Sequence, residues 1–178
     1  MNHEIEAKIK VAALEPVAEI LQACEARFEY NVHQTDTYFM DAAGQLREKD
    51  CALRIRQQVI NDERSTLITF KGPRAGGRFK NRSELETSVG DADIAKTIIE
   101  ALGYQKRIEV QKKRMLWKLD TCEVCLDELP ELGCFVEVEG PDEETISGVL
   151  RKLSLHNEPH ITKSYASMLS KIRNGKQV

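Results

Sequence analysis

The 178-residue chain has the length of a single domain, with at most a small appendage. A net charge of −3 and a sequence pI of about 5.9 argue against a dedicated nucleic-acid-binding protein, which would normally be basic overall. The sequence contains no membrane-length apolar run, has an odd number of cysteines (five), and carries Glu4 and Glu6 where a signal peptide would be apolar, so we expect a cytoplasmic protein without a membrane partner.

The first predicted element is a strand over residues 3–11. With a period of two, one face carries Glu4, Glu6, Lys8 and Lys10, and the other carries Ile5, Ala7, Ile9 and Val11. A short helix around residues 14–24, with Pro16 in its first turn, is followed by a long extended stretch over 27–40 and a turn at 41–44.

The middle of the chain alternates between strands and turns. Strands are predicted over 52–59 and 66–71 with a hairpin turn at 61–63, then a flexible loop at 72–77 and a strand over 79–89. Asp91 is predicted to cap a helix that ends before Gly103 and whose apolar stripe is formed by Ile94, Ile98, Ile99 and Leu102.

Three more strands are predicted in the C-terminal half, over 104–119, 121–126 and 133–139. A helix starts at Pro141-Asp142, and a final helix buries Tyr165, Met168, Leu169 and Ile172. About eight strands with helices inserted among them predict an α+β fold. We find no linker, so the sequence predicts one domain over 1–178 with its core at about 2–172.

Charged faces recur on the predicted strands. Besides Glu4 and Glu6, residues two apart share a face in the sets Arg54 and Arg56; Arg82, Glu84 and Glu86; Lys112 and Arg114; and Glu137 and Glu139. Lys71 is in phase with Thr69, and Asp127 ends the strand before Glu137.

Paired carboxylates on one strand project in parallel and suit a hard cation such as Mg²⁺ or Mn²⁺, while paired arginines and lysines suit phosphate oxygens. If the strands closed into a barrel, these groups would converge in a wet tunnel able to hold a metal-bound polyphosphate. An ordinary antiparallel sheet with one solvated face also shows such alternation. The pattern alone leaves both interpretations open.

Seven segments, in order along nearly the whole chain, resemble the CYTH superfamily, the triphosphate tunnel metalloenzymes. The first is similar to its ExExK signature, and the others to its LRIR, T-(F/Y)-K-G-P, R-x-E-x-E, KxR, L-D…L-G-x-F-x-E-(I/V)-E and S-Y-x-x-x-L segments. In this chain they are Glu4 to Lys8, Leu53 to Arg56, Thr69 to Pro73, Arg82 to Glu86, Lys112 to Arg114, Leu126 to Glu139, and Ser164-Tyr165 with Leu169.

The resemblance implies a closed eight-stranded antiparallel barrel with a charged interior and helices packed outside. It also implies a divalent cation, Mg²⁺ or Mn²⁺, and a triphosphate substrate such as ATP, thiamine triphosphate or inorganic tripolyphosphate. The segments look most like the bacterial class IV adenylate cyclase group, whose reaction converts ATP to cyclic AMP and pyrophosphate. The alternative is a triphosphatase in which a basic side chain such as Lys71, or a metal, activates water.

The resemblance also assigns site residues. The catalytic set would be Glu4, Glu6, Lys8 and Lys71, and the metal would be held by Glu4, Glu6, Glu137 and Glu139, with Asp127 and Glu86 as weaker candidates. The triphosphate would be bound by Lys8, Arg54, Arg56, Lys71, Arg82, Lys112, Arg114 and, from the last helix, Lys163.

A non-catalytic polyphosphate-binding module is a third hypothesis. The paired carboxylates count against it, because they would repel a bare polyanion. The sequence shows no identifiable adenine pocket, and it leaves open whether the protein is a monomer or a homodimer.

Overall fold

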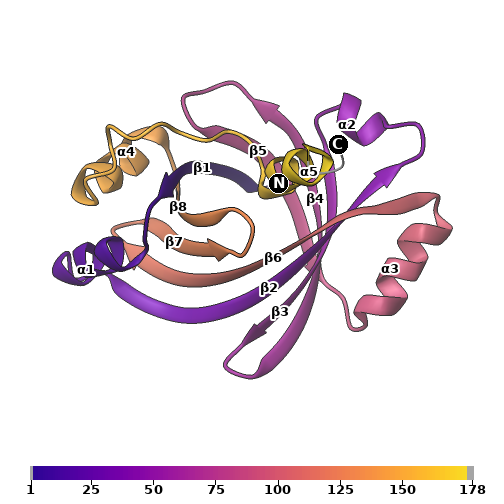
Figure 1. The fold of residues 1–178 in the computed structure, drawn as a ribbon, viewed down its shortest axis with the longest axis horizontal. Coiled ribbons are helices and arrows are strands. Elements are labelled where there is room, and N and C mark those ends of the chain that lie inside the picture. The colour runs from indigo at the N-terminus through magenta and orange to yellow at the C-terminus, as the bar shows by residue number, and fades with distance from the viewer. Residues whose placement is uncertain (1, 176–178) are drawn as a thin grey trace.

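Residues 2–175 of the computed structural model are described, with side chains from Glu4 onward. In this range eight antiparallel strands form a closed barrel in the order β1-β5-β4-β3-β2-β6-β7-β8 (Figure 1). The strands are β1 (Asn2–Val11), β2 (Arg27–Asp41), β3 (Ala52–Ile60), β4 (Glu63–Ala75), β5 (Lys80–Ser88), β6 (Tyr104–Leu119), β7 (Cys122–Leu129) and β8 (Gly133–Gly140). The predicted α+β barrel is therefore confirmed.

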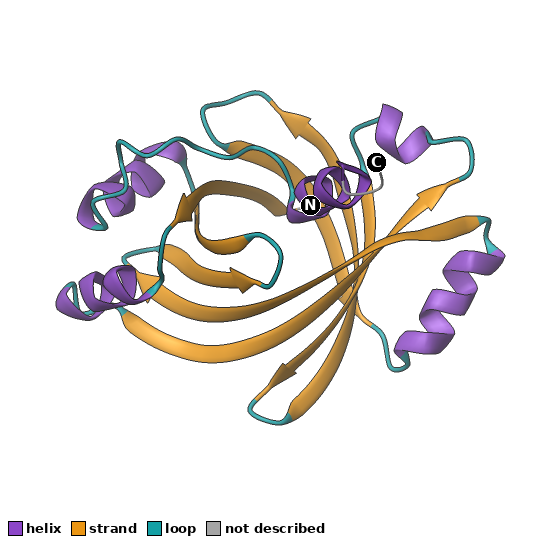
Figure 2. Cartoon of the chain, viewed as in Figure 1, coloured by secondary structure: helices purple, strands orange, loops and turns teal. Residues whose placement is uncertain are grey.

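Strand β1 closes the barrel because it pairs with β5 on one side and with β8 on the other. The long strands β2 and β6 pair over most of their length and arch across the molecule (Figure 2). The β3–β4 hairpin has a two-residue turn in which Asn61 and Asp62 have φ angles of 49° and 66°. Such left-handed pairs favour tight hairpins, and this confirms the predicted turn.

Five helices lie outside the barrel in the described part of the chain: α1 (Glu15–Ala23), α2 (Gln45–Glu48), α3 (Ala92–Ala101), α4 (Glu143–Lys152) and α5 (Tyr165–Gly175). The largest apolar core lies between the outer face of the barrel and helices α1 and α4, where Ile9, Val136 and Ile146 have no exposed surface. The apolar faces of the strands thus point outward under helices, and their charged faces point inward.

Helix α5 packs against one end of the barrel, drawn in yellow in Figure 1. Its Tyr165 ring meets the Phe135 ring edge to face at 5.1 Å, and Leu169 is buried in the same cluster. The segment before α5 is tied to β1, since the backbone N–H of Ile161 donates to the carbonyl of Lys8 at 2.8 Å. These contacts bring α5 next to the barrel interior.

The secondary structure differs from the sequence prediction at β4 and α2. Strand β4 runs on to Ala75 through most of the predicted loop, with an irregularity between Lys71 and Arg74, and the short helix α2 was not expected. The irregularity lets β4 pass the Gly72-Pro73 pair while keeping its pairing with β5.

The apolar stripe of α3 is mostly exposed. Ile99 is 4% exposed and packs on Phe39 and Ile55, but Ile94, Ile98 and Leu102 are 60%, 55% and 71% exposed. Only one of the four predicted stripe residues is therefore buried, because α3 packs on the barrel mainly against β3 and β6. The helix start is as predicted: the Asp91 carboxylate accepts from the N–H groups of Asp93 and Ile94.

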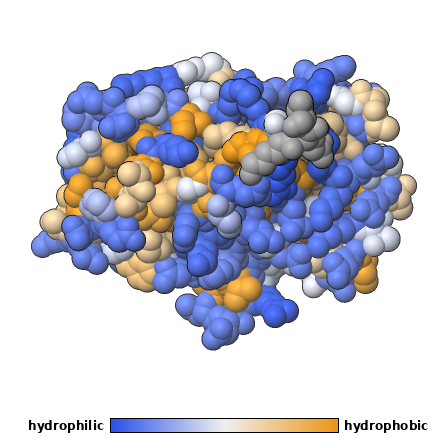
Figure 3. All heavy atoms as spheres, in the orientation of Figure 1, coloured by the Kyte–Doolittle hydropathy of each residue, from blue (hydrophilic) through white to orange (hydrophobic). Residues whose placement is uncertain are grey.

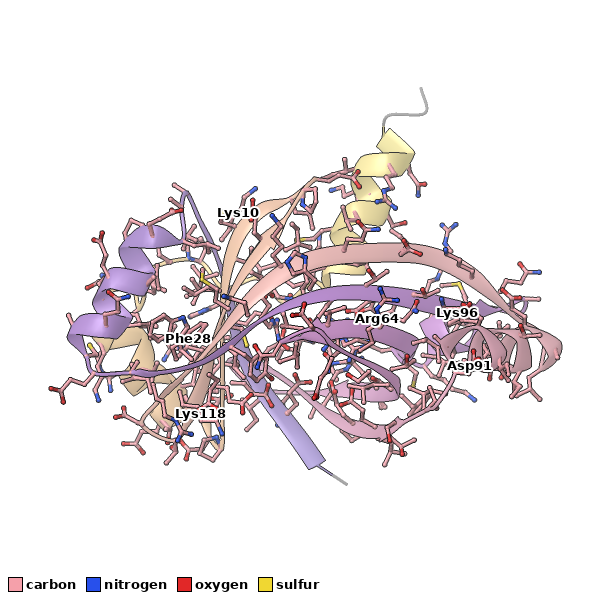
Figure 4. The ribbon with its side chains drawn as sticks, turned by 90° about the horizontal axis from the view of Figure 1, so that it is seen from below. Lys10, Phe28, Arg64, Asp91, Lys96 and Lys118 are labelled. Atoms are coloured by element: carbon pink, nitrogen blue, oxygen red, sulfur yellow. The ribbon has the colours of Figure 1, made fainter. Side chains whose placement is uncertain are left out.

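Figure 4 places Asp91 and Lys96 with α3 at one end of the molecule, and Phe28 and Lys118 with α1 at the other. The face seen in Figure 3 is mainly hydrophilic, with apolar patches between the charged side chains. Among the helices described, none combines the length and apolarity needed to cross a membrane.

Candidate active site

The barrel encloses a cavity of about 1490 Å³, lined by residues of all eight strands and of α2 and α5. Most of the predicted site residues line it: Glu4, Glu6, Lys8, Arg54, Arg56, Lys71, Arg82, Glu86, Lys112, Arg114, Glu137 and Glu139. Several are almost completely buried, including Glu6, Lys8 and Arg54 at 6%, 3% and 5% exposure. The inward orientation required by the tunnel interpretation is therefore present.

One region of the cavity is acidic and is formed by β1, β5 and β8. The Nζ of Lys80 lies 2.9 Å from Glu6 Oε1, and the Nζ of Lys71 lies 3.1 Å from Glu4 Oε2 and also pairs with Glu84. Lys71 and Glu84 are direct neighbours in the β4–β5 register. The carboxylates thus outnumber the lysines that pair with them.

This excess of negative charge appears in the carboxyl pKa values. Burial and a hydrogen bond with Glu4 raise the pKa of Glu84 to about 7. Burial would also raise the pKa of Glu4, but the hydrogen bond from Glu84 and the charges of Lys71 and Lys80 hold it well below its usual range. Burial and the nearby charge of Glu4 raise the pKa of Glu139 to about 8. A cation placed among these groups would relieve the repulsion.

The acidic region gives the protein a pH-dependent stability. A carboxyl whose pKa is raised on folding stabilises the fold below its unfolded pKa of about 4.5, and this contribution is lost as the pH rises through 7 to 8. We therefore expect the Tm of the metal-free protein to decrease as the pH is raised from 5 to 9. The variant Glu139→Gln should melt a few degrees higher than the wild type at pH 8.5 and nearly equally at pH 5, measured by scanning fluorimetry in EDTA.

The matched control is Glu128→Gln, an exposed residue on the outer face of β7, which should leave the profile unchanged. Mg²⁺ should raise the Tm of the wild type most at high pH, where Glu139 is ionised. A Glu139→Gln variant that melts lower than the wild type at pH 8.5 would contradict the expected repulsion. Below pH 4 the pH dependence of stability reverses, and stability decreases as the pH falls. The reason is that Glu4 and Glu137 have lowered pKa values and lose their stabilising ion pairs on protonation.

The adjoining region holds Lys8, Glu137 and Arg114. The Nζ of Lys8 is 3.0 Å from Glu137 Oε1, and it also lies 4.1 Å from the centre of the Tyr165 ring. Arg114 reaches the other carboxylate oxygen of Glu137. Burial would raise the pKa of Glu137, but Lys8 and Arg114 hold it well below its usual range. Glu137 therefore stays ionised between two cations.

The lysines of the cavity differ in their pKa. Burial would lower the pKa of Lys71, but the charge of Glu4 outweighs it and raises the value. Burial and the charge of Arg114 lower the pKa of Lys112 to about 8. In the ligand-free protein Lys71 is therefore protonated, which counts against its predicted role as the base that activates water.

Two cavity-lining arginines each have a side-chain N–H donor without a hydrogen-bond partner among the described residues. Within residues 2–175 the buried Nε groups of Arg54 and Arg82 have no hydrogen-bond partner. Arg82 uses Nη2 to donate to the backbone carbonyl of Asp50, two residues beyond the end of α2. Buried, unpaired guanidinium donors are costly unless a ligand satisfies them.

The structure places two predicted site residues, Asp127 and Lys163, outside the cavity lining. Asp127 is fully buried and does not line the cavity; its oxygens accept two hydrogen bonds from Arg114 at 2.6 Å and one from the Tyr165 hydroxyl at 2.9 Å. Lys163 has an exposed side chain outside the cavity lining, and only its carbonyl reaches the site, accepting from Lys8 Nζ at 3.4 Å. Glu86 lines the cavity and accepts from the Thr69 hydroxyl at 2.7 Å.

The cavity also contains residues that the sequence did not assign. Lys80 and Glu84 lie in phase with Arg82; the period of two had already placed Glu84 on that face without a site role, and it could have added Lys80. Asp36 stands on β2 directly opposite Arg56, and this pairing is visible only in the three-dimensional register.

A divalent cation fits the chemistry of the acidic region. Among the described residues, no three carboxylate, histidine or cysteine side chains stand close enough to hold a metal as they are. The donors are nevertheless all oxygens, they occur as pairs two residues apart, and two of them have raised pKa values. This donor set suits a hard divalent cation such as Mg²⁺ or Mn²⁺.

The CYTH domain family matches residues 2–166. The chain belongs to the CYTH domain family. It is 29% identical over 174 residues to the "Putative adenylate cyclase MJ0240" of Methanocaldococcus jannaschii, covering 93% of this chain and 97% of that protein.

Two solved structures of similar fold cover nearly the whole of this chain. The PH1819 protein from Pyrococcus horikoshii OT3 has a TM-score of 0.85 at 24% identity, covering 96% of this chain and 99% of that one. HpAC1 from Hippeastrum, described as a putative adenylyl cyclase with a dominant triphosphatase activity, has a TM-score of 0.68 at 18% identity, covering 98% of this chain and 96% of that one. These likenesses extend over the whole barrel.

Proposed function

We propose that this CYTH protein is a divalent-metal-dependent enzyme that acts on a triphosphate bound inside the barrel. The observation that carries the proposal is the convergence of two opposite charge sets in one buried cavity. Carboxylates of β1, β5 and β8 face a group of cations that includes Lys8, Arg54 and Arg114. A metal-bound triphosphate has the complementary arrangement of charge.

In this proposal Lys8, Arg54, Arg56, Lys71, Arg82, Lys112 and Arg114 bind the phosphate oxygens, and Glu4, Glu6, Glu137 and Glu139 hold the metal. The bound Mg²⁺ or Mn²⁺ would supply charge neutralisation at the phosphates and acidify the attacking hydroxyl. The chain itself orients the triphosphate through buried, ion-paired cations, which lose little freedom when the ligand arrives.

The size of the cavity supports a nucleoside triphosphate as the substrate, and the first candidate reaction is cyclase-like, on ATP. Ligand pockets commonly measure about 300–1,000 Å³, and 1490 Å³ leaves room for a ribose and base beside the triphosphate. In that reaction the ribose 3′-oxygen attacks the α-phosphorus, and pyrophosphate leaves.

Hydrolysis is the second candidate. The Hippeastrum protein of the same fold is described as mainly a triphosphatase. The protonated state of Lys71 suits a role in binding the terminal phosphate, to which water would add.

A substrate panel separates the two reactions. The protein should be incubated with ATP, thiamine triphosphate or inorganic tripolyphosphate, each with Mg²⁺ and with Mn²⁺, and cyclic AMP, pyrophosphate and orthophosphate should be measured separately. Cyclic AMP formed together with pyrophosphate is the expected result. Orthophosphate from tripolyphosphate without cyclic AMP from ATP would support the triphosphatase instead.

The controls are reactions in EDTA and reactions with the triphosphate replaced by a monophosphate. No turnover of any triphosphate with either metal, despite tight binding of tripolyphosphate, would contradict catalysis and support a polyphosphate-binding module.

A further inference from the structure

Asp36 is a buried carboxylate that no part of the proposed chemistry uses directly. It lies on β2 at 3% exposure, and its neighbour across the β2–β3 pair is Arg56. Its Oδ1 accepts from Arg56 Nε at 2.6 Å, and its Oδ2 accepts from Arg56 Nη2 at 2.8 Å and from Arg54 Nη1 at 3.2 Å. One carboxylate therefore fixes two guanidinium groups.

Arg54 is held on a second side as well. Arg54 Nη2 donates to the hydroxyl of Thr69 at 3.1 Å, and that hydroxyl donates to Glu86. The side chains of Arg54 and Arg56 are only 6% and 12% exposed, although both line the cavity. Before any ligand binds, the Arg54 guanidinium is thus held from two sides, and the Arg56 guanidinium is held by its two hydrogen bonds to Asp36.

We propose that Asp36 is a positioning residue of the triphosphate site, which orients Arg54 and Arg56 so that their free N–H groups point into the cavity. The inference rests on the proposed function of the barrel as a triphosphate site. Planar guanidinium groups bind phosphate best when their fork is aligned with two oxygens, and alignment in advance saves the entropy of ordering two long side chains.

A purely coulombic effect of Asp36 has the opposite sign. Burial would raise the pKa of Asp36, but Arg54 and Arg56 hold it well below its usual range, so the carboxylate is ionised at neutral pH. A fixed negative charge beside a polyanion is repulsive, and its removal should tighten binding if charge alone mattered. Positioning predicts weaker binding after the same removal, so the two explanations differ in direction.

The experiment compares Asp36→Asn with the wild type by calorimetric titration with inorganic tripolyphosphate in EDTA, where no turnover occurs. We expect the Kd to rise by about 10- to 100-fold, by analogy with the loss of a residue that orients a metal-binding side chain. The matched control is Asp120→Asn, an exposed aspartate outside the cavity whose partner is Lys152 at 2.8 Å, and its Kd should equal that of the wild type.

A double-mutant cycle tests whether Asp36 acts through an arginine. In an Arg56→Gln background, the Asp36→Asn change should raise the Kd by much less than it does alone, because part of what it orients has gone. Asp36→Glu, which keeps the charge but displaces it by one methylene, should weaken binding by an intermediate amount. This variant also provides the test if Asp36→Asn does not fold.

Each outcome has a defined meaning. A folded Asp36→Asn protein that binds tripolyphosphate as tightly as the wild type, or more tightly, would overturn the inference and leave the proposed function intact. So would full additivity of the two changes in the cycle. A wild-type protein that binds none of the triphosphates, either in EDTA or with Mg²⁺, would overturn the proposed function and the inference together.

Discussion

The variant Glu6→Gln should lose metal-dependent turnover by about 100-fold or more while retaining the fold. Metal ions contribute several kcal/mol of charge stabilisation to such reactions, and tenfold in rate corresponds to about 1.4 kcal/mol. Glu6 is a strong candidate ligand because it is 6% exposed, faces the cavity and is the register neighbour of Glu139. Its amide replacement can still accept from Lys80, which lies 2.9 Å away.

Binding of the anion alone should respond in the opposite direction. Removal of one buried negative charge leaves the cavity more positive, so tripolyphosphate in EDTA should bind as tightly as before or more tightly. The measurements are steady-state rates against Mg²⁺ concentration and a calorimetric titration without metal. Glu128→Gln, on the outer face of β7, controls for the loss of a strand carboxylate.

Loss of turnover in Glu6→Gln that excess Mg²⁺ partly restores would mark Glu6 as a metal ligand. Equal turnover of Glu6→Gln and wild type at all Mg²⁺ concentrations would remove Glu6 from the metal site. If turnover and metal-free binding fell together, Glu6 would instead be orienting Lys8 and Lys80.

The variant Asp127→Asn should lower the stability of the protein by about 3–5 kcal/mol, the usual cost of leaving buried charges without their partner. Asp127 has no exposed surface, and it accepts two hydrogen bonds from Arg114 and one from Tyr165, with the Lys112 Nζ at 3.5 Å. In a chain of this length, this loss corresponds to a decrease in Tm of roughly 6–20 °C.

This prediction decides the role of Asp127, which the family resemblance offered as a weaker metal ligand. Urea unfolding in EDTA measures the stability without metal, and Asp120→Asn serves as the exposed control, with an expected change of at most about 1 kcal/mol. If Asp127→Asn were as stable as the wild type in EDTA but no longer stabilised by Mg²⁺, Asp127 would be a metal ligand rather than the anchor of Arg114 and Tyr165.

The sequence alone predicts which residues share a face of each strand. Residues two apart on one strand must share a face, so the pairing of Arg54 with Arg56 and of Glu137 with Glu139 follows from backbone geometry alone. The same period identifies Ile9 and Val136 as members of the opposite face, and both are fully buried under helices. What the alternation could not decide was which face points to water, because an open sheet and a closed barrel share the pattern.

Helix α3 shows a second limit of the sequence. Its stripe has the spacing of a buried helix face, yet only Ile99 is covered, while Leu102 is 71% exposed. Hydrophobic periodicity states which side of a helix prefers burial, but the curvature of the surface beneath it determines how much of that side is reached.

The pairing of charges was decided only by the tertiary structure. In sequence, Asp36 precedes Arg54 by 18 residues and Asp127 follows Arg114 by 13, and nothing in those distances distinguishes a metal ligand from an arginine anchor. The register of β2 with β3 and of β6 with β7 places each aspartate directly opposite an arginine. The sequence by itself determined which residue types line the strands, through the period of two. Closure of the barrel then determined which of them became buried partners and which remained open to a ligand, because hydrogen bonding across strands depends on register and not on composition.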